Sequence, residues 1–164
     1  MEYRKALWVA PLLLVIHNFE EYLTMPTFIA GHWRDLPGFI SNITSWSSHQ
    51  FSIALIIVTL MAFLFTYFGS ISKANGTGMF IAITTQVVLL INAVQHIAAS
   101  IWFRTYTPGV LTSIILYLPL LSYLILQSLK EGYISKKQLI YSIILGTTML
   151  LPIILLIKWV ASFL

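Results

Sequence analysis

ALWVAPLLLVIHNFEEYLTMPTFIA, residues 6–30, is an apolar stretch that is long enough to cross a bilayer, yet it contains a histidine and two glutamates. A charged side chain near the middle of a membrane helix costs about 2.5–3.5 kcal/mol on insertion scales, so such residues normally face a protein interior and serve a function there. At about 100° per residue, Glu20 and Glu21 lie about 60° and 40° to either side of His17. The three side chains can therefore serve one site.

The composition of the whole chain also indicates a membrane protein. The chain has 164 residues, of which 59% are hydrophobic and 9% are charged, whereas soluble domains carry about 25% charged residues. The mean hydropathy is +0.89. The absence of cysteine excludes disulfides and thiolate metal ligands. We expect a single integral-membrane domain over residues 1–164, without a separate soluble catalytic domain.

Five apolar runs are long enough to cross the membrane, which predicts an all-α, polytopic membrane helix bundle with about five transmembrane helices. Because the first run is long and carries the charged motif, we interpret it as a retained helix and not as a signal peptide. Polar turns at residues 72–77 and 130–137 separate the second run from the third and the fourth from the fifth. The approximate spans are residues 6–28, 51–71, 78–103, 110–129 and 139–164.

The basic residues predict the orientation of the bundle. Six of them fall on the side of the N-terminus and three on the other side, so the N-terminus is expected to be cytoplasmic. We expect the cytoplasmic membrane of a prokaryote as the location. No basic stripe interleaved with exposed aromatics is present, which argues against nucleic acid as a partner, and the sequence does not indicate the oligomeric state. The two groups are Arg4, Lys5, Lys73, Lys130, Lys136 and Lys137, against Arg34, Arg104 and Lys158.

The longest connection, residues 30–48, has a composition suited to the membrane interface. It contains Trp33, Pro37, Phe39 and Trp46, and amphipathic rings prefer the level of the lipid headgroups. The segment is either an aromatic-anchored loop or a lid over a site.

Polar residues of several helices converge in the outer half of this topology. Asn92 and His96 share one face of the third predicted helix, at about the depth of the two glutamates. Asn92 either forms an interhelical hydrogen bond of structural importance only or belongs to the site. His49 lies at the mouth, where the second helix re-enters the membrane. By contrast, the inner halves carry few polar groups, mainly Thr84, Gln86, Tyr117 and Tyr123.

Because no lysine or arginine lies deep in any span, the two carboxylates need a cation, protons or each other. Glutamate and histidine spaced i, i+3 on an inward helix face are ligands of helix-bundle metal sites, and imidazole with carboxylate suits zinc, iron or manganese. We therefore predict a divalent metal held by His17, Glu20 and His96, with Glu21 and His49 as further candidates. Three ligands leave a position for water or substrate.

The remaining polar residues receive catalytic and binding roles in this interpretation. The i, i+3 spacing favours Glu20 as the ligand and Glu21 as the general base, although the opposite order stays open. Asn92 is a further candidate catalytic residue. Arg104 and Tyr106, in the turn after the third helix, are expected to contact the headgroup of a substrate.

A small integral-membrane protein with His17-x-x-Glu20-Glu21 in its first span resembles the HXXEE family, which is named for this motif. The resemblance covers most of the chain in size and layout. It implies a membrane location and a site at the three motif residues, and it implies no reaction.

The residues favour a membrane-embedded, metal-dependent enzyme that acts on a lipid or another hydrophobic substrate in the outer half of the bilayer, by hydrolysis or acyl transfer. One alternative is a metal-free acid-base lipid isomerase, in which two close carboxylates hold different protonation states. Another alternative is a transporter for protons or metal ions, and a third is a subunit whose polar cluster binds a partner helix.

Overall fold

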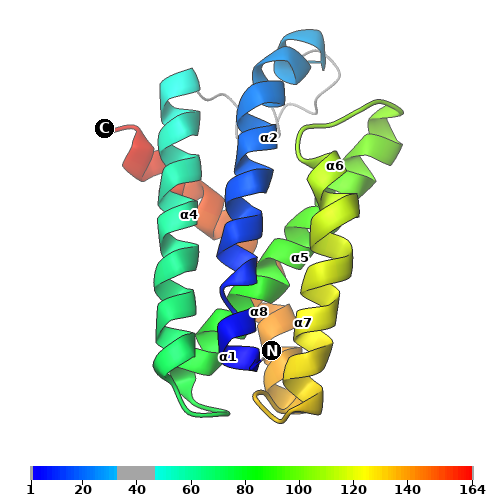
Figure 1. Cartoon of the computed structure of the whole chain (residues 1–164). Helices are drawn as coiled ribbons and strands as arrows, with labels where there is room; N and C mark the ends of the chain where they lie inside the picture. Colours follow the sequence, from blue (N-terminus) through cyan, green and yellow to red (C-terminus); the bar gives the residue numbers. More distant parts are fainter. Residues whose placement is uncertain (1, 33–46, 164) are drawn as a thin grey trace.

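A computed structural model describes residues 2–32 and 47–163 of the chain. Every regular element in these residues is helical, which confirms the predicted all-α class (Figure 1). The elements are α1 (Tyr3–Ala6), α2 (Val9–His32), α4 (Ser48–Ile71), α5 (Thr77–Phe103), α6 (Val110–Thr112), the π-helical turn η2 (Ser113–Tyr117), α7 (Leu118–Lys130) and α8 (Lys136–Ala161).

Four helices are long and apolar enough to cross a membrane: α4, α5, α8 and the continuous helix Val110–Lys130, which comprises α6, η2 and α7. The 24-residue helix α2 is as long as α4, but its polar motif lowers its hydropathy. Large apolar side chains such as Leu60, Ile101 and Leu126 are more than 60% exposed on the outside of the bundle. Because such a surface is unusual for a soluble protein, the chain is a membrane protein.

Helix α5 lies at the centre of the bundle, where it packs against α4, α8 and the helix Val110–Lys130. Helix α2 packs against α4 on one side and against α6 and η2 on the other. Small residues allow the closest approach, because a Cβ at Gly69 of α4 would lie 2.4 Å from the Cβ of Ala82 in α5. Small residues at contacts of this kind are typical of helix packing in membranes.

Local sequence signals explain several helix ends. Ser47 and Gln50 form a capping box at the start of α4, and Ser135 and Gln138 form another at the start of α8. In each box the serine side chain accepts the backbone N–H of the glutamine, while the glutamine side chain accepts the backbone N–H of the serine. The first long helix, α2, instead follows the separate short helix α1.

Proline accounts for one irregularity beside the site described below. Pro119 lacks a backbone N–H, and its ring would clash with the carbonyl of Ile115 in a regular α-helix. The five residues Ser113–Tyr117 form a π-helical turn directly before it. Such turns are rare and are frequent at functional sites.

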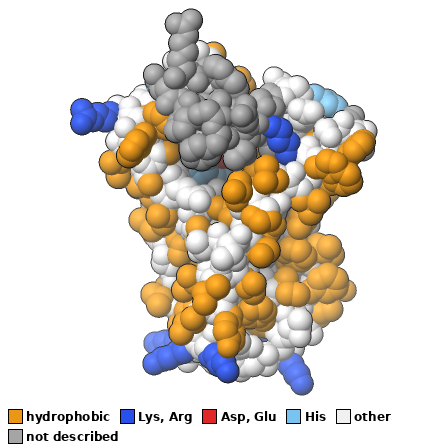
Figure 2. Space-filling view, turned by 180° about the vertical axis from the view of Figure 1, so that it is seen from behind, with side chains coloured by type: hydrophobic (Ala, Val, Ile, Leu, Met, Phe, Trp, Pro, Cys, Tyr) orange, Lys and Arg blue, Asp and Glu red, His pale blue; other side chains and the backbone are white. Residues whose placement is uncertain are grey.

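The two ends of the chain lie at opposite ends of the bundle (Figure 1). The N-terminus shares its end with the α4–α5 and α7–α8 connections, so successive long helices run in alternating directions. Basic side chains lie along the lower end of the molecule and also at its upper end, with hydrophobic side chains over the surface between them (Figure 2). The compartment that this end faces stays a prediction.

Candidate metal centre

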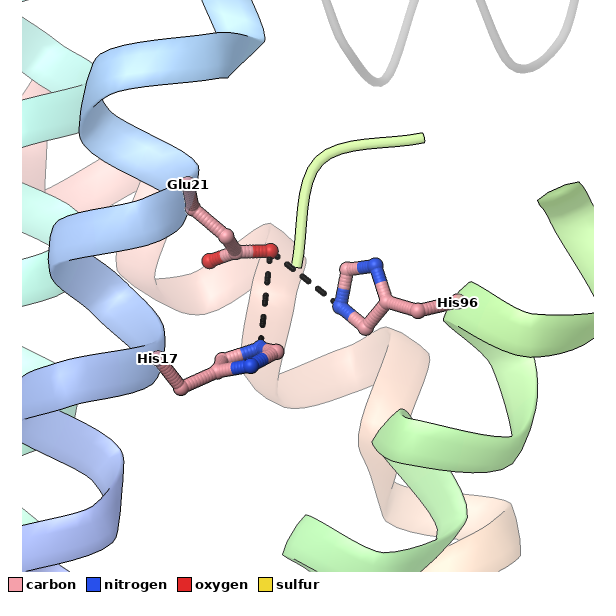
Figure 3. Close-up of side chains that lie close together, drawn as sticks. All are labelled: His17, Glu21 and His96. Atoms are coloured by element: carbon pink, nitrogen blue, oxygen red, sulfur yellow. Dashed lines mark ion pairs between the residues drawn. The ribbon is translucent and has the colours of Figure 1, made fainter. Parts of the chain in front are cut away.

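Three titratable side chains from α2 and α5 converge inside the bundle, in the half away from the N-terminus (Figure 1). The Nε2 atom of His96 lies 3.1 Å from Oε1 of Glu21, and Nε2 of His17 lies 3.8 Å from the same oxygen (Figure 3). His17 is fully buried and Glu21 is 9% exposed. Among the described residues, His17, Glu21 and His96 form the group of this kind that could hold a metal ion, with ligand atoms within 4.8 Å of one another.

The spacing of these atoms fits a small divalent cation. Metal–ligand distances of about 2.0–2.1 Å in a tetrahedral zinc site place neighbouring ligand atoms about 3.3 Å apart. The two distances from Glu21 to the histidines, 3.1 and 3.8 Å, lie on either side of this value. The donor set of two imidazoles and one carboxylate suits zinc, iron or manganese.

Asn92 completes the inner wall of the cluster. Its amide nitrogen lies 3.0 Å from Nε2 of His96 and 3.4 Å from Nε2 of His17, and it can donate a hydrogen bond to each ring. The rings of the two histidines meet edge to face, with centroids 5.0 Å apart. The amide and both rings thus point toward one small volume, as the shared face of Asn92 and His96 predicted.

A hydrogen-bond chain fixes the orientation of His17. Its Nδ1 lies 2.7 Å from Oγ1 of Thr112, and this hydroxyl donates to the carbonyl of Gly109 at 3.3 Å. In the tautomer in which Nδ1 donates to Thr112 and the hydroxyl donates to the carbonyl, Nε2 keeps its lone pair for the cluster. A partner of this kind on the remote ring nitrogen is the usual support for a histidine metal ligand.

The backbone at Gly109 lies directly against the two imidazoles. Gly109 has a φ of +79°, and a Cβ at this position would lie 2.7 Å from Cε1 of His17 and 3.1 Å from Cε1 of His96. Glycine is therefore required twice, for its left-handed conformation and for the close approach. Thr107, in the same turn, donates to the carbonyl of His96 at 3.0 Å and ties the turn to α5.

Tyr117, the last residue of the π-helical turn, stacks on His17 with ring centroids 4.6 Å apart. The sequence predicts Tyr117 in the inner half of the bundle. In the structure it lies beside His17 instead, seven residues after the start of the helix at Val110. The hydroxyl of Tyr117 and that of Ser113 are buried without a hydrogen-bond partner in the described part of the chain.

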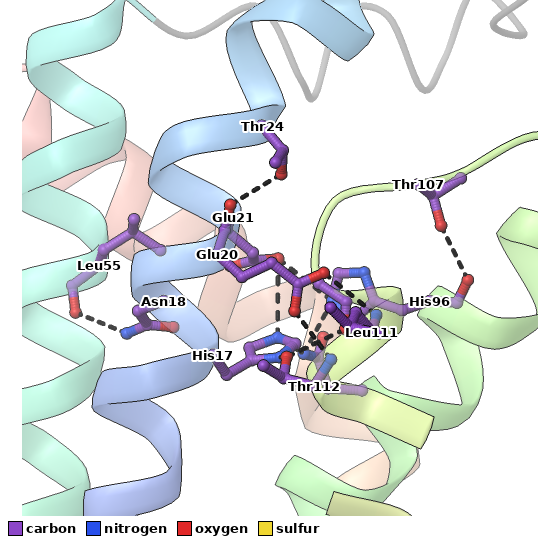
Figure 4. Close-up of polar contacts among 12 residues, drawn as sticks. His17, Asn18, Glu20, Glu21, Thr24, Leu55, His96, Thr107, Leu111 and Thr112 are labelled. Atoms are coloured by element: carbon purple, nitrogen blue, oxygen red, sulfur yellow. Dashed lines mark hydrogen bonds and ion pairs between the residues drawn. The ribbon is translucent and has the colours of Figure 1, made fainter. Parts of the chain in front are cut away.

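Glu20 points away from the two histidines and caps the helix that starts at Val110. Its carboxylate accepts the backbone N–H groups of Leu111 at 3.1 Å and Thr112 at 2.8 Å, together with the hydroxyl of Tyr106 (Figure 4). Carboxylates are favourable at helix N-termini because they pair with unbonded N–H groups and with the positive end of the helix dipole. We call these contacts the Glu20 latch.

The two glutamates lie in different places. The i, i+3 spacing favoured Glu20 as the metal ligand, but its carboxylate is engaged by the first turn of the next helix. The i, i+4 neighbour Glu21 lies beside His17 and His96. The roles of ligand and base stay a prediction, and this geometry favours Glu21 as the ligand.

Tyr106 belongs to the latch as well as to the surface. It is 46% exposed in the turn between α5 and α6. Partial burial and the hydrogen bond to Glu20 raise the pKa of Tyr106 to about 12, so its hydroxyl remains a donor at physiological pH. Arg104, the other residue expected to meet a headgroup, is exposed at the C-cap of α5 with a φ of 52°.

Two further expectations have different outcomes. His49 is exposed in the first turn of α4 and does not belong to the His17, Glu21 and His96 group. Most of the candidate lid, including Trp33, Pro37, Phe39 and Trp46, lies outside the described residues.

Comparison with known proteins identifies the family of the chain. The family described as "Protein of unknown function with HXXEE motif" matches residues 8–124. The chain belongs to the HXXEE family. It is also 29% identical over 147 residues to the uncharacterized protein YrkK of Bacillus subtilis (strain 168), which covers 88% of this chain and 89% of that protein. No solved structure matches.

The geometry divides the three named positions of the HXXEE motif between two environments. His17 and Glu21 lie in the cluster, while Glu20 forms the latch to α6. The residues matched by the family also include Asn92, His96 and Thr112. The site thus lies within the part of the chain that represents the family, whereas α8 lies outside it.

Sequence reasoning missed Gly109 and Thr112. Gly109 follows Pro108 and starts a helix, a signal for a turn with a left-handed residue, but its approach to His17 depends on tertiary packing. Thr112 carries no signal of its own, because a threonine in a membrane helix most often bonds to a carbonyl of its own helix.

Proposed function

We propose that the chain is a membrane-embedded, metal-dependent enzyme that acts on a lipid or another hydrophobic substrate, by hydrolysis or acyl transfer. The observation that carries this proposal is the convergence of His17, Glu21 and His96 in the interior of a membrane bundle. In the described part of the chain, Glu21 pairs with the two histidines and with no lysine or arginine. Such a group is costly in a membrane interior unless a cation joins it.

The support for a metal site extends beyond its three ligands. His17 is oriented by Thr112, and the amide of Asn92 lies beside both imidazoles. Three protein ligands with an open fourth position are characteristic of catalytic sites, and not of structural ones. A divalent cation bound there would act as a Lewis acid toward a carbonyl or phosphoryl oxygen.

The side chains of the cluster supply the remaining functions in this proposal. Glu21 faces the histidines with one oxygen and turns the other away from them (Figure 3), so the second oxygen can accept a proton from the attacking nucleophile. When a metal takes the lone pairs on Nε2 of His17 and His96, the amide of Asn92 is released from the rings and can donate a hydrogen bond to an oxygen that gains negative charge. Glu20 holds α6, and with it Gly109 and Thr112, against the cluster.

A lipid-like substrate follows from the surroundings of the cluster. The bundle presents exposed apolar side chains to the membrane, and the cluster lies within it. Arg104 is exposed near the outer end of α5 and would meet a headgroup. In this proposal the N-terminus is cytoplasmic, and the substrate comes from the outer half of the bilayer of a prokaryotic cytoplasmic membrane.

A transporter for protons or metal ions is less well supported. The core on the N-terminal side of the cluster contains buried apolar residues, among them Leu13, Leu14, Leu89, Leu121 and Leu124. A pathway for ions needs polar groups along its whole length. A polar cluster confined to one depth of the bundle suits an enzyme better than a pathway across the membrane.

Lipid analysis tests the proposed activity. The wild-type protein, His96→Ala and His49→Ala are reconstituted separately into vesicles made from total bacterial lipids, and the lipids are followed by mass spectrometry. We expect the wild type and His49→Ala to convert the same lipid class, and His96→Ala to lose this conversion. His49→Ala is the matched control because His49 is an exposed histidine outside the cluster.

A chelator arm separates the metal from the protein residues. Treatment of the wild type with a chelator should stop the conversion, and addition of zinc, iron or manganese should restore it. Conversion that is unaffected by the chelator but lost in His96→Ala would support the acid-base isomerase instead. Unchanged lipids with metal-loaded wild type would contradict the enzymatic proposal.

A further inference from the structure

An apolar cavity of about 310 Å³ lies among α2, α4, α5 and α8, and none of the cluster residues His17, Glu21 and His96 lines it. The polar side chains in its lining are Thr84 and Thr85. Their hydroxyls donate to carbonyls of their own helix, Thr84 to Phe80 and Thr85 to Ile81. The cavity therefore offers an apolar surface with no free hydrogen-bonding group on its threonines, which suits hydrocarbon.

The cavity continues the helix faces that carry the cluster. Leu14 lines the cavity and lies three residues before His17, so the two are about one turn apart on neighbouring parts of one face of α2. Leu89 lines the cavity and lies three and seven residues before Asn92 and His96 on α5. The same two faces are thus polar toward the outer end and apolar toward the N-terminal end.

We propose that this cavity holds the alkyl chain of a single-chain lipid whose polar end lies at the metal cluster. This inference rests on the function proposed above, because it assigns the substrate class of that site. An amphipath oriented along α2 and α5 matches the change from polar to apolar on both faces. The volume is at the low end of the range for ligand pockets, about 300–1,000 Å³, which suits one chain and not two.

The chain enters from the bilayer, between the two most exposed walls of the cavity. Only 17% of the most apolar window of α4 and of α8 is buried, compared with 39% for α5. Pro152 lies in α8 between the lining residues Met149 and Ile153. Because Pro152 lacks the N–H of a regular helix, α8 can bend at this wall at a lower cost than an unbroken helix.

The cavity contributes selectivity more than affinity. Lipid tails are about as apolar as leucine, so an alkyl chain gains little when it moves from the bilayer into the cavity. The contacts of the polar end with the cluster provide the affinity. The size of the cavity then decides which chain lengths place the polar end at the metal.

Photolabelling in nanodiscs tests this inference. The probe is a lysophosphatidylcholine with a diazirine at the end of its acyl chain, and labelled positions are mapped by mass spectrometry. We expect labels on cavity residues such as Met61 and Met149. Ala62→Phe fills the cavity and should reduce this labelling at least about fivefold, since the added ring occupies the volume of several methylene groups.

Two more variants keep the test decisive. Leu64→Phe is the matched control, because Leu64 is 50% exposed on α4 and does not line the cavity; its labelling should equal that of the wild type. Met61→Ala enlarges the cavity without overpacking and should shift the preferred probe to a longer chain. The shift in preferred chain length in Met61→Ala therefore tests the cavity site even if Ala62→Phe does not fold.

Metal content and a two-chain probe separate the possible failures. Equal labelling of the wild type, Ala62→Phe and Leu64→Phe, with metal retained in all three, overturns the cavity site and leaves the metal site standing. A wild type without metal that still labels in the cavity overturns the proposed function and retains the cavity site. Equal cavity labelling by a two-chain phosphatidylcholine probe overturns the assignment to a single-chain lipid.

Discussion

Glu20 and Glu21 are adjacent in the sequence, yet their carboxylates serve different parts of the molecule. Glu21 lies beside His17 and His96 inside the bundle, whereas Glu20 accepts the backbone N–H groups of Leu111 and Thr112 at the start of the next helix. One turn of α2 thereby supplies a ligand to the proposed metal and also positions the segment that covers it.

The Glu20 latch should contribute to the stability of the bundle. Glu20→Ala removes the acceptor of two backbone N–H groups, and loss of a helix cap costs about 0.5–2 kcal/mol. We expect a lower Tm for Glu20→Ala in a thermal unfolding assay in detergent. Glu2→Ala is the control, because the Glu2 side chain makes no capping hydrogen bond at the start of α1; an equal loss in both variants would contradict the latch.

Gly109 should be required by the site and not only by the turn. In Gly109→Ala the new Cβ meets the His17 ring at 2.7 Å, so the variant should lose metal as well as stability. Gly132→Ala is a matched control: Gly132 also has a positive φ, +75°, but no atom lies within 4 Å of a Cβ there. Both variants should unfold more easily, while only Gly109→Ala should lose metal.

Thr112 should tune the metal site through His17. Thr112→Val keeps the backbone N–H that binds Glu20 but removes the hydroxyl 2.7 Å from Nδ1 of His17. Loss of such a supporting partner typically lowers metal affinity about 10–100-fold. Competition with a chromophoric chelator measures this change, and the control Thr147→Val removes an exposed hydroxyl that bonds within its own helix. Equal affinities in all three proteins would remove Thr112 from the site.

The sequence predicted the helices well because membrane helices are decided by length and hydropathy. Helical periodicity predicted that Asn92 and His96 share one face, and their residue numbers predicted that they lie at about the depth of the first-helix motif. The structure brings these residues together. Periodicity and depth can be read from each helix separately. Once the order and direction of the helices are known, they predict which polar faces lie at the same level.

The roles of Glu20 and Glu21 could not be separated in this way. Both lie within about 60° of His17 on α2, so the choice depends on which neighbour each carboxylate meets. Glu20 meets the first turn of α6. The position of that turn depends on Gly109, directly before it, and on the π-helical turn directly after it. Tyr117, which stacks on His17, belongs to this π-helical turn, so regular α-helical periodicity does not give the direction of its side chain.

The orientation in the membrane is a separate prediction. The chain has no natural cysteine, so single-cysteine variants report without further changes. Lys136 lies at the start of α8, at the end of the bundle that holds the N-terminus, and Ser47 lies at the start of α4, at the other end. The basic-residue bias predicts that a membrane-impermeant maleimide labels Ser47→Cys in intact cells and leaves Lys136→Cys unlabelled. Labelling of both from outside would contradict the topology.

Element-resolved metal analysis of Glu20→Gln and Glu21→Gln, purified in parallel with the wild type, tests the central claim most directly. Both substitutions remove one carboxylate from the same turn of α2 and preserve its shape. We predict about one divalent ion per chain in the wild type and in Glu20→Gln, as for a site with one metal, and loss of the ion from Glu21→Gln. A wild type without metal, or loss of metal from Glu20→Gln with retention in Glu21→Gln, would contradict it.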